Sequence, residues 1–142
     1  MTDILNNLLK VNLDAAKGYS YAAENIKNDN FRHFLKTYAD QRKRYAEELK
    51  QEILDLGGEP VENTSLLGDL HQALVKIKDS VSSDKDEALL EECSRGEGEA
   101  IAQYEKVIET EPFSTELRKL IMTQYDKIRA ARSTMDELAR VV

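Results

Sequence analysis

Apolar and small side chains recur every three or four residues along most of the chain. One such run extends from Ile4 to Ile26, and a second extends from Phe31 to Leu56. This spacing places the apolar residues on one face of an α-helix. Two further runs, at about 85–109 and 117–142, show the same period, which is strongest in the last one. The pattern therefore predicts four long amphipathic helices.

Short polar segments separate the first runs and predict where helices begin and end. Thr2 or Asp3 is expected to cap the first helix, and Asn30 the second, after the tight turn NDN. Residues 57–60 read GGEP, in which glycine supplies a left-handed cap and proline prevents continuation. The second helix is therefore expected to end there.

The connection between the second and third long helices is much longer than the other two. It covers residues 57–84 and carries a shorter amphipathic run from Leu66 to Ile77. A bundle in serial up-down order needs a short connection at this point, whereas two antiparallel hairpins joined by a long crossover form the ferritin-like arrangement. We therefore predict one all-α domain over residues 1–142, a ferritin-like four-helix bundle with a fifth, shorter helix in the crossover.

Residues 91–100, EECSRGEGEA, place two glycines and the one cysteine inside the third long run. Glycine within a helix costs about 1 kcal/mol relative to alanine, so a gain in packing is expected to compensate for it. Small residues recur at helical spacing in the first helix too, which predicts that the two segments cross closely. The alternative is that they make room for a site. These residues are Ala15, Gly18, Ala22, Cys93, Gly96 and Ala100.

Glu97 borders the predicted core, and Tyr104 follows it by seven residues, as in one helix of di-iron carboxylate proteins. Such sites need a Glu from each of two helices and a Glu-x-x-His from each of the other two. The sequence contains no Glu-x-x-His. We therefore predict no standard di-iron site and no cofactor, and keep Glu97 only as a weak ligand candidate for iron or manganese.

Basic and aromatic residues stand where such a site would lie. Arg42 interrupts an apolar stripe between two tyrosines, and Arg129 borders the stripe of the last helix. Because a buried arginine must be paired, we expect Glu97 to pair with Arg42 or Arg129, with tyrosine hydroxyls completing the network. The alternative is that both arginines extend their heads into solvent. The candidate network is Glu97, Arg42, Arg129, Tyr38, Tyr104 and Tyr125.

The remaining polar residues are expected to be inert. Cys93 is interpreted as a buried, unreactive thiol because it lacks an electropositive setting. His33 is expected to be exposed, and His71 to lie at the core boundary of the crossover helix. Neither histidine has a second ligand at metal spacing.

The composition limits the cellular location and the classes of binding partner that we expect. The net charge of −7 argues against nucleic acid and against an anionic membrane surface as partners. A single cysteine cannot form an internal disulfide, so a cytoplasmic location is expected. The first residues lack the features of a signal peptide, and no apolar stretch is long enough to span a membrane.

Several runs resemble an uncharacterised bacterial family with a ferritin-like four-helix bundle, whose members often carry a C-E-R-G-E-D run in the third long helix. The runs are AAENIKN, YAEELKQEILDLGGEP, LHQALVKIKDSV and EECSRGEGEAIAQYEKVIE, which cover nearly the whole chain. The resemblance implies a ferritin-like fold and no known activity. Relatives often have an acid at the position of Gly98 and near the positions of Ala15, Ala16 and Lys17. The loss of these acids argues against a metal role for this chain.

Three functions remain open at this point. The favoured one is a non-catalytic bundle that acts through its surface, by self-association into a homo-oligomer or with a protein partner the sequence does not name. The second is an unconventional metal-binding bundle that uses Glu97 with iron or manganese. The third is a stress-related small-molecule binder, with a cavity at the crossing of the small residues.

Overall fold

The computed structural model describes residues 1–62, 69–79 and 85–141, with the side chains of 69–71 left undescribed. The described part is all-helical and contains no strand. Its helices are α1 (Thr2–Asn25), α2 (Asp29–Asp55), α3 (Asp69–Asp79), α4 (Lys85–Thr110) and α5 (Thr115–Arg140). The prediction of an all-α bundle is confirmed.

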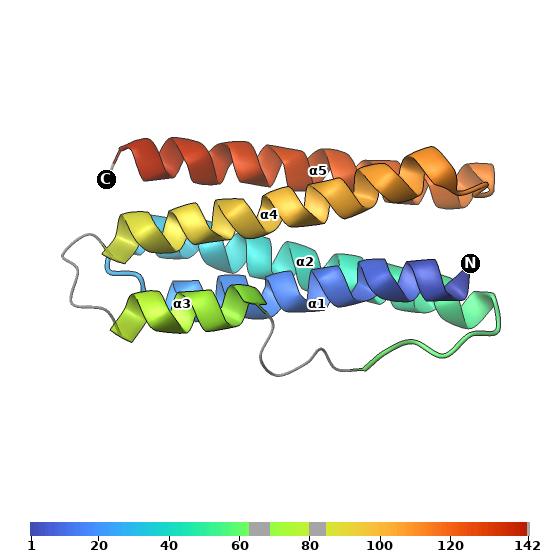
Figure 1. Cartoon of the computed structure of the whole chain (residues 1–142), viewed down its shortest axis with the longest axis horizontal. Coiled ribbons are helices and arrows are strands. Elements are labelled where there is room, and N and C mark those ends of the chain that lie inside the picture. Colours follow the sequence, from blue (N-terminus) through green and yellow to red (C-terminus); the bar gives the residue numbers. More distant parts are fainter. Residues whose placement is uncertain (63–68, 80–84, 142) are drawn as a thin grey trace.

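The long helices form two antiparallel hairpins, α1 with α2 and α4 with α5 (Figure 1). The hairpins pack with α1 against α4 and α2 against α5, and α3 lies on α1 and α4. As the prediction of a crossover requires, α3 belongs to the connection between the hairpins. The N-terminus lies at the end of the bundle where α4 turns into α5, and the C-terminus lies at the opposite end (Figure 1).

The predicted N-caps of the first two helices are wrong. Met1 occupies the N-cap position of α1, so Thr2 and Asp3 lie inside the first turn. Asn28, not Asn30, caps α2: its backbone is extended, and its side-chain oxygen accepts hydrogen bonds from the next helical N–H groups. An asparagine in this conformation satisfies donors that would otherwise have no partner at the start of the helix.

The C-terminal end of α2 follows the prediction. Gly57 has a φ of +80°, in the left-handed region that a glycine adopts without steric cost. The Gly58 N–H donates to the Ile53 carbonyl at 2.9 Å, which satisfies one of the last carbonyls of the helix. A Cβ on Gly58 would lie 2.7 Å from a Thr2 methyl carbon, so this turn packs closely on the start of α1.

Hydrogen bonds tie the connections to the hairpins at both ends of the bundle. The Asp86 carboxylate, in the first turn of α4, accepts from the backbone N–H groups of Lys27 and Asn28 in the turn between α1 and α2. At the other end, the Asn6 side chain bonds the Glu59 carbonyl and the Val61 N–H. The Asp86 contacts join the start of the second hairpin to the first, and the Asn6 contacts hold the start of the crossover on α1.

The buried apolar residues form two clusters, separated along the bundle by polar side chains. The first cluster includes Leu9, Tyr45 and Ala100, and the second includes Ala15, Ala39 and Cys93. Three buried polar residues lie between the clusters: Asn12 on α1, Arg42 on α2 and Glu97 on α4. We call the polar centre the group Asn12, Tyr19, Arg42, Glu97, Tyr104 and Gln124.

Candidate functional site: the buried polar centre

Arg42 and Glu97 form an ion pair at the middle of the bundle. Arg42 Nη2 donates to Glu97 Oε1, and the two side chains are 0% and 2% exposed. Their helices, α2 and α4, do not pack directly against each other in the described chain. The pair therefore crosses the bundle interior from one helix to the diagonally opposite one, and each charge has the other as its compensation.

The ionisation of Glu97 reflects two opposing effects. Burial raises the pKa of the Glu97 carboxyl above its ordinary value, because removal from water disfavours the charged form. The Arg42 charge, the Tyr19 hydroxyl and the Arg132 charge each lower the pKa and offset part of the effect of burial. Arg42 is therefore the main group that favours the charged form of this buried carboxyl.

A second chain of hydrogen bonds links all four long helices. Tyr104 on α4 accepts from Asn12 Nδ2 on α1 at 2.8 Å and donates to Gln124 Oε1 on α5 at 2.7 Å. Gln124 Nε2 in turn donates to Glu48 Oε1 on α2 at 3.0 Å and approaches the Tyr45 carbonyl at 3.5 Å. Burial raises the pKa of Tyr104, so its hydroxyl remains a donor at neutral pH.

Tyr19 is a member of the polar centre that the sequence analysis missed. Its side chain is buried, and burial together with the nearby Glu97 carboxylate raises its pKa. The interaction is strong enough to lower the pKa of Glu97, although neither Tyr19 Oη nor Glu97 Oε2 meets the geometry of a direct hydrogen bond. Tyr19 lies one turn from Ala15 and Ala22, so the small-residue stripe of the first helix was a signal that could have identified it.

Three of the predicted network residues lie outside the polar centre. Arg129 is exposed and lies over the half-buried ring of Tyr125, with its guanidinium carbon 5.4 Å from the ring centroid. The pairing of Glu97 with Arg129 is therefore wrong, because α5 turns Gln124 inward and leaves Arg129 on its outer face. Tyr38 is half-buried, and its ring centroid lies 5.7 Å from that of Tyr19.

The predicted small residues gather where α1 approaches α4. Ala15, Gly96 and Ala100 line one crevice of about 220 Å³ between these two helices. The others are buried in the interior: Gly18, Ala22 and Cys93. The small side chains thus allow the two helices to approach while leaving a shallow opening beside the polar centre.

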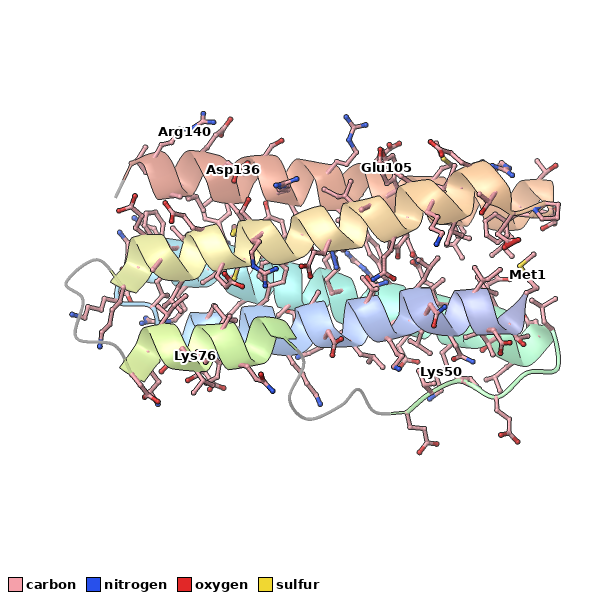
Figure 2. All side chains as sticks on the ribbon, in the orientation of Figure 1. Met1, Lys50, Lys76, Glu105, Asp136 and Arg140 are labelled. Atoms are coloured by element: carbon pink, nitrogen blue, oxygen red, sulfur yellow. The ribbon has the colours of Figure 1, made fainter. Side chains whose placement is uncertain are left out.

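A smaller polar group lies at the rim, between α4 and α5. Ser94 Oγ donates to the Asp136 carboxylate, and Arg132 Nε approaches the Ser94 hydroxyl at 3.5 Å. Figure 2 shows Asp136 on α5, close to α4. The Arg132 guanidinium lies over Gly98, 2.9 Å from where a Cβ would be. An acid at position 98 would therefore meet an arginine.

The described residues contain no group of three or more histidine, cysteine, aspartate or glutamate side chains that could hold a metal ion. His33 is exposed, as predicted, and the side chain of His71 lies outside the described residues. Cys93 is buried, and burial raises the pKa of its thiol, as does the nearby Glu97 carboxylate. The thiol is therefore protonated and a poor nucleophile.

None of the helices in the described ranges is both long and apolar enough to cross a membrane.

Comparisons with known proteins identify a family and a fold. A crystal structure of a conserved hypothetical protein, rv2844, from Mycobacterium tuberculosis superposes with a TM-score of 0.78. The match covers 96% of this chain and 94% of that chain at 12% sequence identity, which shows a shared fold and nothing about activity. No curated protein matches the chain significantly. The family described as Domain of unknown function (DUF2383) matches residues 1–110, which end at the last residue of α4. The chain therefore belongs to this uncharacterised family.

Proposed function

We propose that the chain is a non-catalytic, ferritin-like helical bundle of the cytoplasm that acts by self-association, and that its polar centre has a structural role. The observation that carries the proposal is the Arg42–Glu97 pair. Glu97 is the one carboxylate buried in the part of the chain with described burial, and a guanidinium already neutralises it. The Arg42 charge lowers the affinity of this carboxylate for a cation and favours its deprotonated form.

The structural role follows from which helices the polar contacts join. Arg42–Glu97, Asn12–Tyr104 and Gln124–Glu48 each connect the first hairpin with the second. Apolar contacts are non-directional, whereas a buried hydrogen bond is satisfied in only one register. The polar centre therefore selects one relative position of the two hairpins.

Metal binding at Glu97 and a small-molecule site at the crossing of the small residues are less well supported. The Arg42 charge beside Glu97 repels a cation, which opposes iron or manganese binding at this carboxylate. The crevice at the crossing of the small residues measures about 220 Å³, below the range of about 300–1,000 Å³ that is typical of small-molecule sites.

The surface offers an apolar end for self-association. Met1, Leu54 and Leu56 are 44%, 49% and 51% exposed. They share one end of the bundle, because the Gly58 backbone packs against Thr2 (Figure 2 labels Met1 at this end). We assign this end to contact with a second copy of the chain. Acidic residues nearby, such as Asp55, repel their counterparts on the other copy, so association is expected to strengthen as salt rises.

Sedimentation equilibrium of untagged protein tests this function. We expect a dimer in the wild type and a monomer in the Leu54→Glu/Leu56→Glu variant. Phe34→Glu is the matched control, because Phe34 is also exposed but lies near the start of α2, at the opposite end of the bundle. A wild type that remains monomeric at every concentration and salt would refute self-association. Metal analysis showing about one or two iron or manganese ions per chain would refute the structural role of the polar centre.

A further inference from the structure

Five buried polar atoms of the polar centre have no hydrogen-bond partner among the described residues. They are Asn12 Oδ1, Tyr19 Oη, Arg42 Nε, Arg42 Nη1 and Glu97 Oε2. Each belongs to a side chain that is at most 2% exposed. Buried polar atoms are nearly always satisfied in folded proteins, so a cluster of unsatisfied ones indicates an additional partner.

The chemistry of these atoms defines that partner. The two Arg42 nitrogens need an acceptor, whereas Glu97 Oε2 and Asn12 Oδ1 need a donor. A metal cation would satisfy the oxygens but be repelled by Arg42, and an anion would satisfy Arg42 but be repelled by Glu97. An apolar ligand would satisfy none of the five atoms. A small neutral molecule that both donates and accepts fits all of them.

We propose that the polar centre is a binding site for water, in which ordered water molecules bridge the Arg42–Glu97 pair to Asn12 and Tyr19. A buried water makes about three hydrogen bonds, so five atoms call for about two molecules.

Solvent already comes close to this site. The crevice between α1 and α4 is lined by Ala15, which lies one turn from Asn12, and by Gly96 and Ala100, which flank Glu97. This opening offers an exchange route for the bound water. The hydration site does not depend on self-association, since it lies in the interior of one chain.

Oxygen-17 magnetic relaxation dispersion, which counts long-lived bound water, tests the proposal. The variant Arg42→Met/Glu97→Leu removes three of the five unpartnered atoms and keeps apolar bulk in their place. We expect it to hold fewer long-lived waters than the wild type. The matched control is Arg95→Met/Glu92→Leu, which removes an Arg–Glu pair at the surface of α4, away from the crevice, and is expected to leave the count unchanged.

An equal water count in the wild type and the folded interior variant would overturn the proposal. A measurement on the wild type keeps the test valid if that variant does not fold. NMR cross-peaks between water and the Arg42 Nε–H, or water density between Arg42, Glu97 and Asn12 in a high-resolution crystal structure, would support the site. Density showing the five unpartnered atoms bonded directly to protein groups, or a metal ion or an organic molecule in this position, would refute it.

Discussion

Replacing Arg42 by methionine removes the charge that compensates Glu97 and keeps most of the apolar stem of the side chain. Both partners are essentially inaccessible to bulk solvent, and a neutral water molecule does not supply the positive charge of the guanidinium. Breaking a buried pair by removing one partner typically costs about 3–5 kcal/mol. We expect Arg42→Met to fall in this range at neutral pH.

The magnitude also follows from the protonation of Glu97. Without Arg42, the pKa of Glu97 rises further, because burial remains and the main lowering effect is lost. Protonating a carboxyl with an unfolded-state pKa of about 4.3 costs about 4 kcal/mol at pH 7 and about 1 kcal/mol at pH 5. A carboxyl whose pKa is raised in the folded state lowers the stability of the folded protein as the pH rises toward that pKa. The variant should therefore be several kcal/mol less impaired at pH 5 than at pH 7.

Urea unfolding, followed by circular dichroism at both pH values, measures this difference. The double variant Arg42→Met/Glu97→Leu should recover most of the loss, because replacing a buried pair with apolar residues is often neutral or stabilising. Arg95→Met serves as the control: its pairs with Glu92 and Glu99 are at the surface, so we expect a loss of less than about 1 kcal/mol.

A small and pH-independent effect of Arg42→Met would contradict this prediction. If Arg42→Met costs less than about 1 kcal/mol at both pH values, the pair does not hold a buried charge. Additive effects of the two single substitutions would likewise show that Arg42 and Glu97 are not coupled.

Three further predictions concern the rest of the interior. Tyr104→Phe removes the hydroxyl that joins the Asn12 amide N–H to the Gln124 carbonyl oxygen. It should lower the free energy of unfolding in urea by about 1–3 kcal/mol, with no loss of helix content in the folded state. An unchanged urea midpoint would contradict the hydrogen-bonded chain. Burial raises the pKa of both Tyr104 and Tyr19, so their contribution to stability is present below the ordinary tyrosine pKa of about 10 and is lost as pH rises above it. Ultraviolet titration should accordingly show these two tyrosines ionising only together with alkaline unfolding, and ionisation in the folded protein would count against their burial. Cys93 should react with a thiol reagent only at the rate of unfolding, and rapid labelling of the native protein would show that the thiol is accessible.

The helices and their order could be predicted because they depend on local signals. A period of three to four apolar residues defines an amphipathic helix whatever surrounds it, and Gly57 ended α2 with a positive φ as its sequence context indicated. The long connection between the hairpins excluded a serial bundle by geometry alone. The cap of α2 was less predictable, since Asn28 and Asn30 are both good capping residues and the backbone conformation decides between them.

The inward face of α1 shows where periodicity was insufficient. The run predicted from Ile4 to Ile26 has Ala15 and Gly18 on its inward face, whereas the structure also buries Asn12 and Tyr19. Burying a polar side chain costs little free energy only when the side chain has a hydrogen-bond partner in the interior. For Asn12 the partner is Tyr104, on a helix 92 positions away in sequence, which no local pattern can identify.

Periodicity and turn residues were enough to predict the amphipathic helices, the helix end at Gly57 and the need of a core arginine for a counter-charge. Which arginine meets Glu97 depends on how the helices pack. Arg42 interrupts its stripe and Arg129 borders its own, so both were candidates, and the rotation of α5 against α4 places Gln124 inside and Arg129 outside. The residues of a helix specify which of its sides is apolar. The exact rotation of the helix about its own axis depends on how it packs against all its neighbours.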